Sequence, residues 1–167
     1  RSTSFVGTGF LNAVPYVLAA IAMILWARHS DRTGERIWHI AITTFLAALG
    51  LAASALAGSL IITMLAVIVA TVGIYATFGP MFVSPTDFLS GRGAGGSVAI
   101  LGVLGNLGGF VGPYIIGLTK DYTGSFTVAL LVEAGCLLLA GLLALCLKFL
   151  AVAPSRGSLL PVKTTAS

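Results

Sequence analysis

The chain has 167 residues, of which 57% are apolar and only 8% are charged. A soluble domain needs roughly a quarter of its residues charged to cover its surface, so this composition excludes a water-soluble globular protein. The net charge of +4 does not indicate nucleic-acid binding, because the nine Lys and Arg residues are spread between apolar runs instead of clustering on one solvated face. We therefore expect an all-α integral membrane helix bundle.

The apolar runs predict five transmembrane helices, since a helix needs about 20 residues to cross the hydrocarbon core. The first run is uncharged from Phe5 to Ala27. A second run of fifty uncharged residues, 37–86, is too long for one span, so we expect it to turn at 57–59. The predicted spans are 5–27, 37–57, 60–84, 97–119 and 126–147.

The connections are predicted from proline, glycine and charge. Pro80 is expected to kink the third span and Pro85 to end it. Residues 84–96 are expected to form a loop, and residues 120–124 a short polar turn. The membrane portion is thus 5–150, and the tail at 151–167, rich in Pro, Ser and Thr, is expected to be a disordered cytoplasmic segment.

The basic residues predict the orientation of the spans. Placing the loop at 28–36 in the cytoplasm puts seven of the nine basic residues inside, as the positive-inside rule requires. The C-terminus is then cytoplasmic, and we expect a multi-pass protein of the cell inner (plasma) membrane. The chain begins without methionine and has an odd number of predicted spans, so we expect a fragment that lacks its N-terminal part, although a complete five-span product stays open.

Catalytic and metal-binding patterns are missing from the sequence. Cys136 and Cys146 lie in one predicted span, where ten residues of helix separate them by about 15 Å, too far for a disulfide. The sequence has no zinc-type spacing, no nucleophile–base constellation and no phosphate-cradling loop. We therefore expect no enzyme activity, no metal and no cofactor.

The charged loop at 27–36 is the most distinctive segment, because it holds six of the sixteen ionisable side chains. Its pattern, Gly-x-x-x-Asp-Arg-x-Gly-x-Arg, resembles the signature loop of the major facilitator superfamily. Asp31, Arg32, Gly34 and Arg36 match the pattern, and Ala27 replaces its first glycine.

Four segments resemble the anion:cation symporter branch of that superfamily: 10–16, 28–36, 105–114 and 120–125. The branch imports organic anions such as phthalate, tartrate, sugar acids and 4-hydroxyphenylacetate, generally with protons. By position, 5–150 resembles the eighth to twelfth helices of the twelve-helix fold. The resemblance implies that seven helices, including the whole N-terminal half and half of the substrate cavity, are missing, so the chain alone is expected to be inactive.

The resemblance also implies a role for the charged loop. An acidic side chain near a helix N-terminus is stabilised by the partial positive charge there. By resemblance, Asp31 would latch the two halves together and favour the outward-open state, with Arg32, Gly34 and Arg36 forming the rest of the latch loop. The alternative is that these charges only mark topology and bind lipid phosphates.

A second pattern is a stripe of glycines in the fourth span. Gly102, Gly105, Gly109 and Gly112 recur every three or four residues, which places them on one helix face and predicts close helix packing. A sliding surface for alternating access is a compatible extension.

Five polar or aromatic residues are candidates for lining the substrate cavity. Asn106 needs a hydrogen-bond partner inside the membrane and would contact either a substrate carboxylate or another helix. Asn12 and Tyr16 are four residues apart, on one face, although Tyr16 also suits the interfacial aromatic belt. Tyr75 and Phe78 precede the proline break and line the cavity or form a packing pair.

Glu133 is the only charged residue inside a predicted span. A charge there costs roughly 2.5–3.5 kcal/mol on insertion scales, so Glu133 is a candidate for proton coupling. The alternatives are a protonated, hydrogen-bonded carboxyl or a carboxylate with a partner elsewhere. His39, near the predicted membrane surface, is a weaker candidate for titration.

These inferences lead to a hypothesis of secondary active transport, with proton-coupled import of a small organic anion by alternating access. The expected partners are that anion, a proton, the lipid bilayer and the missing N-terminal half, without nucleic acid. The alternatives are a non-transporting membrane sensor, an assembly subunit of the same fold, or an exporter. No Lys or Arg lies mid-span, so a cation for the substrate is expected in the missing helices.

Overall fold

The computed structural model describes residues 5–151 and is all-helical over that range. Each of its five helices is long and apolar enough to cross a membrane, which confirms the predicted all-α membrane fold. The predicted disordered tail, apart from its first residue, lies outside the described residues. The helices are α1 (Phe5–Thr33), α2 (Arg36–Leu56), α3 (Leu60–Phe88), α4 (Arg92–Thr123) and α5 (Phe126–Ala151).

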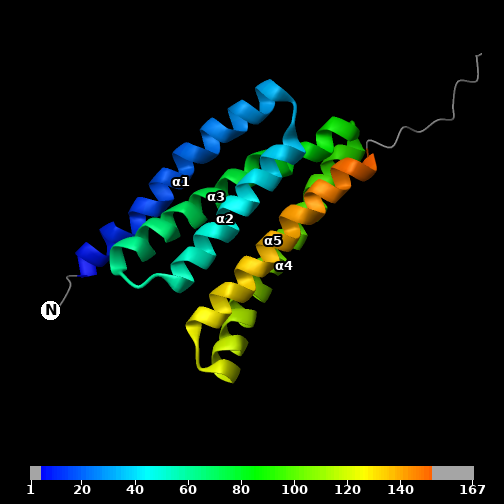
Figure 1. The fold of residues 1–167 in the computed structure, drawn as a ribbon. Helices are drawn as coiled ribbons and strands as arrows, with labels where there is room; N and C mark the ends of the chain where they lie inside the picture. Colours follow the sequence, from blue (N-terminus) through cyan, green and yellow to red (C-terminus); the bar gives the residue numbers. More distant parts are fainter. Residues whose placement is uncertain (1–4, 152–167) are drawn as a thin grey trace, which may run out of the picture.

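The helices form one bundle in which α2 and α3 are the central pair (Figure 1). Helix α1 packs against the other side of α3, and α5 packs against α2. Helix α4 is held mainly by α5 and makes a smaller contact with α3. One end of the bundle therefore collects the end of α1, the start of α2, the end of α3, the start of α4 and the end of α5, and we call it the loop end.

Small residues bring α2 and α3 into backbone contact. A Cβ atom added to Gly50 would lie 2.5 Å from the backbone nitrogen of Ala70. One added to Gly73 would lie 2.6 Å from the backbone nitrogen of Ala47 and 2.7 Å from the carbonyl oxygen of Thr43. Such close approach is possible only for residues without a side chain, and it is the usual way that helices associate in membranes.

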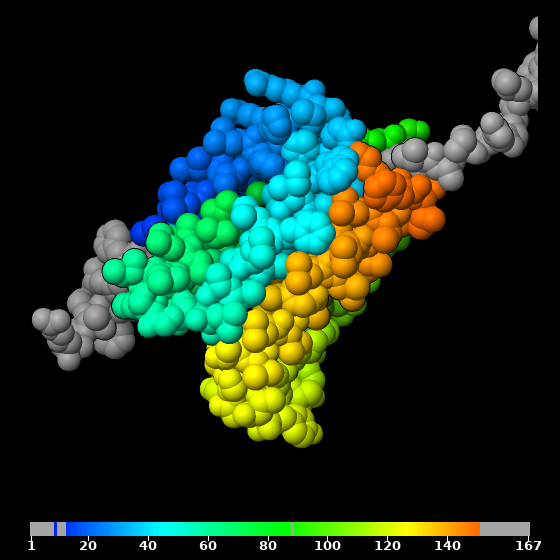
Figure 2. All heavy atoms as spheres, in the orientation of Figure 1, coloured from blue at the N-terminus to red at the C-terminus, as the bar shows by residue number. Residues whose placement is uncertain are grey.

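Helix α4 is the least covered element. None of its residues is buried, and the turn that joins it to α5 projects beyond the neighbouring helices (Figure 2). Added Cβ atoms at Gly102, Gly105 and Gly109 would meet nothing within 4 Å. The predicted packing role is thus not fulfilled by any described helix at these three glycines, where it stays a prediction about a partner outside the described residues. The fourth glycine of the stripe, Gly112, faces α5.

The connections are shorter than the sequence indicated. Only residues 34–35 separate α1 from α2, and only residues 89–91 separate α3 from α4. The expected loop at 84–96 and the expected stop at Pro85 are therefore wrong: α3 continues past Pro85 to Phe88, where the N–H of Leu89 donates to the carbonyl of Pro85 at 3.0 Å. Proline inside membrane helices is tolerated where local adjustments satisfy the freed backbone groups.

The polar turn expected at 120–124 is also mostly helical. Helix α4 includes Lys120 and extends to Thr123. It ends at Gly124, whose φ of 67° is left-handed and whose N–H donates to the carbonyl of Lys120 at 2.8 Å. A glycine in this conformation is the common C-terminal cap of a helix, so the chain reverses within two residues.

Candidate functional site

Aromatic side chains form a continuous row along one side of α1 and α3. Tyr16 of α1 packs edge-on against Tyr75, with ring centroids 5.9 Å apart. Tyr75 packs edge-on against Phe78 at 5.6 Å, and Phe78 lies 6.3 Å from Phe82. We call these four residues the aromatic row. The structure therefore brings together three of the predicted cavity residues, and it adds Phe82, which the sequence analysis missed.

The aromatic row ends at an open pocket of about 350 Å³ between α3 and α4. This volume lies within the range of small-molecule sites. Asn106, the fourth predicted cavity residue, reaches the same pocket. The pocket is lined by Phe78, Met81, Phe82, Gly102, Gly105 and Asn106.

The amide of Asn106 retains hydrogen-bonding capacity toward this pocket. Its Nδ2 donates to the carbonyl of Gly102, one turn back in the same helix, at 3.0 Å. An amide has a second N–H and a carbonyl oxygen, and neither has a hydrogen-bond partner in the part of the chain that the structure describes. Asn106 therefore does not join two of the described helices, and its contact with a substrate or with a further helix stays a prediction.

A second cavity, of about 320 Å³, adjoins the first and shares Phe78 and Met81 with it. Its other walls come from α2, α3 and α5. The hydroxyls that face it already donate within their own helices, from Thr44 to the carbonyl of Ile40 at 2.6 Å and from Thr77 to that of Gly73 at 2.9 Å. This second cavity is thus apolar in character, and Phe78 and Met81 line both it and the open pocket.

The structure says less about two other predicted site residues, Asn12 and Glu133. Helix α1 contains Asn12, but its side chain lies outside the described residues. Glu133 is half-buried in α5 and faces α4, where its Oε1 would lie 3.5 Å from a Cβ added to Gly112. The absence of a side chain at Gly112 therefore leaves room for this carboxyl between the two helices.

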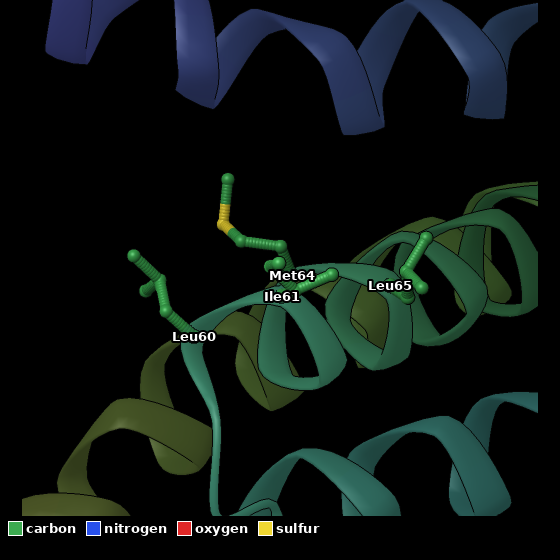
Figure 3. Close-up of a pocket in the computed structure, with 4 residues that line it drawn as sticks. All are labelled: Leu60, Ile61, Met64 and Leu65. Atoms are coloured by element: carbon green, nitrogen blue, oxygen red, sulfur yellow. The ribbon is translucent and has the colours of Figure 1, made fainter.

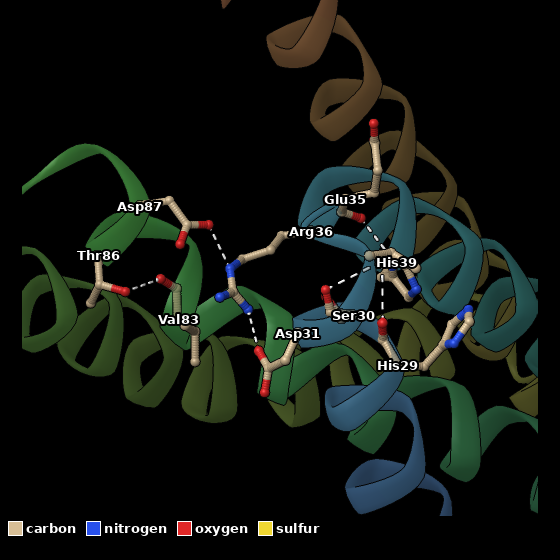
Figure 4. A network of polar contacts seen from close by, with 10 residues as sticks. His29, Ser30, Asp31, Glu35, Arg36, His39, Val83, Thr86 and Asp87 are labelled. Atoms are coloured by element: carbon tan, nitrogen blue, oxygen red, sulfur yellow. Dashed lines mark hydrogen bonds and ion pairs between the residues drawn. The ribbon is translucent and has the colours of Figure 1, made fainter.

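The charged loop carries a three-residue ion-pair cluster at the loop end (Figure 4). Arg36 Nη1 lies 2.7 Å from Asp31 Oδ1, and Arg36 Nε lies 2.5 Å from Asp87 Oδ2. One guanidinium thus joins the end of α1, the start of α2 and the end of α3. The sequence analysis assigned Asp31 and Arg36 to the latch loop. It placed Asp87 in the expected loop at 84–96 and gave it no role.

The other two predicted latch residues, Gly34 and Arg32, take no part in these ion pairs. Gly34 has a left-handed φ of 68°, and its N–H donates to the carbonyl of Ser30 at 2.9 Å. A glycine is suited to this conformation, which reverses the chain between α1 and α2. Arg32 is exposed and forms no ion pair with any described carboxylate.

A second ion pair ties α5 to the same connection. Lys148 Nζ pairs with a carboxylate oxygen of Glu35. The same ammonium lies 5.2 Å from the ring centroid of Trp38, within the range of a cation–π interaction. The start of α2 is therefore held from two sides, by α3 through Arg36 and by α5 through Lys148.

Another apolar pocket, at the start of α3, has no such chemistry (Figure 3). Its volume is about 370 Å³ and its walls are Leu60, Ile61, Met64 and Leu65. It offers no polar group that would orient a ligand, so the aromatic row with Asn106 is the better candidate for a substrate-binding surface.

Comparison with known proteins places these helices in context. The chain is 50% identical over 144 residues to a putative tartrate transporter of Agrobacterium vitis, covering 86% of this chain and 32% of that protein. It is 46% identical over 149 residues to a second putative tartrate transporter of the same organism, covering 89% of this chain and 34% of that protein. A quinolone resistance transporter of Acinetobacter baumannii is 35% identical over 125 residues, covering 73% of this chain and 28% of that protein.

The chain is related to membrane transporters. The resemblance to a transporter family is thereby confirmed, and the names of these relatives also support the prediction that the chain is not an enzyme. The chain spans about a third of the length of the curated relatives it matches. No family model matches the chain, and no solved structure matches it.

Proposed function

We propose that the chain is the C-terminal part of a secondary active transporter of the major facilitator superfamily, in its anion:cation symporter branch. The whole protein would move a small organic anion by alternating access, and import coupled to protons is the direction we favour. The observation that carries this proposal is the 50% identity to a putative tartrate transporter over 144 residues. The described helices would supply one wall of the cavity, and seven further helices the other.

We assign substrate contact to the aromatic row and Asn106. The amide of Asn106 has a free N–H to donate to a carboxylate or hydroxyl oxygen, and Phe78 and Phe82 border the same pocket. The described residues lining this pocket carry no charge, so a cation for the substrate carboxylate would come from the missing half. Asn12, one turn before Tyr16 in α1, stays a further candidate for substrate contact.

The loop end would act as the conformational latch. Asp31 would engage a helix end of the missing half in the outward-open state, while Arg36 positions Asp31 through the 2.7 Å ion pair. Arg32 would complete the charge network. The turn at Gly34 would keep the charged ends of α1 and α2 close together. Gly102, Gly105 and Gly109 of the α4 stripe, which lie open, would pack or slide against the missing half.

Proton coupling and topology complete the proposal. Glu133, half-buried between α4 and α5, is the proton-coupling candidate among the described residues. With the loop end in the cytoplasm, the positive-inside rule is satisfied. The protein would then lie in the cell inner membrane with a cytoplasmic C-terminus.

The test is uptake of labelled tartrate into proteoliposomes that contain the full-length protein, with and without an inward proton gradient. Gradient-driven accumulation supports the proposal, and counterflow without gradient dependence would support transport and refute proton coupling. If no labelled carboxylate is bound or moved, the organic-anion assignment is wrong. A non-transporting sensor of the same fold would bind the ligand without moving it.

An exporter is the second candidate, because one relative is named a quinolone resistance transporter and is 35% identical over 125 residues. The aromatic row would suit a planar aromatic compound, since aromatic rings stack favourably on one another. Reduced quinolone accumulation in cells that express the full-length protein, without carboxylate uptake, would favour export.

A further inference from the structure

Two histidines from different helices lie side by side at the loop end (Figure 4). His29 is near the end of α1 and His39 is in the first turn of α2, and their ring centroids are 5.1 Å apart. His39 is only 6% exposed, whereas His29 is exposed to solvent. His39 is therefore held in place by its neighbours, and His29 is accessible at the surface.

The hydrogen bonds of His39 select one tautomer. Its Nδ1 lies 2.6 Å from the carbonyl oxygen of Glu35. A carbonyl oxygen only accepts, so Nδ1 carries the hydrogen and Nε2 of the neutral ring keeps its lone pair. A histidine that ligates a metal almost always donates its other ring N–H in this way, which fixes the ring and strengthens the ligand.

A tryptophan holds the two rings in place. The ring of Trp26 lies 5.0 Å from that of His39 and 6.1 Å from that of His29. Its indole N–H donates to the carbonyl of His39 at 3.3 Å, which ties α1 to α2 next to the imidazoles. The arrangement is built by contacts between helices and does not depend on an exposed side chain alone.

We propose that His29 and His39 bind one divalent transition-metal ion, with water completing its coordination. Imidazole nitrogens bind such ions at about 2.0–2.1 Å, so two of them on one tetrahedral ion are roughly 3.3 Å apart. Rings with centroids 5.1 Å apart can meet this requirement. The described residues contain no group of three or more His, Cys, Asp or Glu side chains placed to hold a metal, so they supply two donors to this site.

Two of the nearby basic side chains are compensated by carboxylates. Arg36 pairs with Asp31 and Asp87, and Lys148 pairs with Glu35. Arg28 and Arg32, on the same helix as His29, are exposed, so salt screens their repulsion of a bound cation. A bound ion would join the end of α1 directly to the start of α2 across residues 34–35. It would therefore stiffen the connection that the proposed latch uses, although the binding itself does not depend on the transport proposal.

Copper(II) is the appropriate probe, because it binds nitrogen donors most tightly among the divalent first-row metals. The purified full-length protein is titrated with Cu²⁺ alone, and tryptophan fluorescence and the electron paramagnetic resonance spectrum are recorded. We expect saturable quenching that is lost in Trp26→Phe and kept in Trp38→Phe. We also expect nitrogen hyperfine structure from two imidazoles.

The variants decide whether the histidine pair is the ligand. His29→Ala removes one exposed donor and should weaken Cu²⁺ binding by at least about tenfold, since losing even a group that only orients a ligand costs roughly ten- to hundredfold. Arg28→Gln, the adjacent exposed control, should not weaken it. His29→Cys should bind Cd²⁺ more tightly than His29→Ala does, which keeps the test independent of the buried His39. Equal Cu²⁺ affinity of the original protein and His29→Ala, or a spectrum without nitrogen coupling, overturns the proposal.

Discussion

Arg36 and Asp87 are 51 positions apart in the sequence and are joined by an ion pair of 2.5 Å between Nε and Oδ2. The same guanidinium binds Asp31 through Nη1, so the side chain bridges the ends of three helices. This geometry makes Asp87 part of the charged cluster that the loop pattern defines. It also links α3, which carries most of the aromatic row, to the proposed latch.

Replacing Asp87 by asparagine should weaken the latched state. The amide side chain would keep the shape of the carboxylate and lose its charge, and a partly exposed pair of this kind contributes about 0.5–1 kcal/mol. A population ratio that changes two- to fivefold toward the inward-open state is therefore expected, since about 1.4 kcal/mol corresponds to a factor of ten. The measurement is the distance distribution between spin labels placed on the two proposed halves of the full-length protein.

The matched control for this variant is Thr86→Val. The Thr86 hydroxyl donates only to the carbonyl of Val83, at 2.7 Å, within the same helix. Removing it leaves the Arg36 ion pairs intact, so the distance distribution should stay that of the unmodified protein. If Asp87→Asn and Thr86→Val give the same distribution, Asp87 has no part in the latch.

Replacing Gly73 by alanine should destabilise the bundle. The new Cβ would lie 2.6 Å from a backbone nitrogen of α2, so the two helices must separate, at a cost of about 1–3 kcal/mol for overpacking. Gly135→Ala is the control, because a Cβ there meets nothing within 4 Å. The midpoint of thermal unfolding in detergent should fall only for Gly73→Ala, and equal midpoints would refute the close contact of α2 with α3.

The two glycine patterns show what the sequence could and could not predict. Regular spacing singled out Gly105 and Gly109, whereas the tight contacts in the structure are made by Gly50 and Gly73. Spacing along one helix defines a face but does not identify the neighbour of that face. The partner depends on how α2 and α3 cross, which is a property of both sequences together.

The number of helices could be predicted from hydropathy, because a helix that crosses a bilayer needs a minimum length of apolar residues. Helix ends could not be predicted in this way, since Thr86 and Asp87, and the polar segment from Lys120 to Thr123, continue the helices. A charge marks where a chain meets water and not where its hydrogen-bonded helix stops. Asp87 was placed in a loop for this reason. Its ion pair with Arg36 was not predicted, because Arg36 lies on a different helix.

Reversing one charge of the Glu35–Lys148 pair should destabilise the loop end, and reversing both should restore part of the loss. Lys148→Glu places two carboxylates together, while Glu35→Lys combined with Lys148→Glu recreates an ion pair. The restoration is partial because the swapped pair lacks the cation–π contact of Lys148 with Trp38. Thermal unfolding of the two single variants and the double variant should give a coupling of about 0.5–1 kcal/mol. Additive losses in the double variant would show that the pair contributes nothing to stability.

Replacing Asn106 by alanine should raise the KM for a carboxylate substrate about tenfold, which corresponds to the loss of one hydrogen bond of about 1.4 kcal/mol. Phe78→Ala should raise it as well, because Phe78 lines both the open pocket and the second cavity. Leu104→Ala is the matched control: Leu104 is on the same helix as Asn106 and is exposed, but it does not line the pocket. Initial rates of labelled tartrate uptake by the full-length protein, compared at equal amounts of reconstituted protein, provide the measurement. If Asn106→Ala keeps the KM of Leu104→Ala, the amide does not contact the substrate, and the assignment of Asn106 to the substrate cavity is wrong.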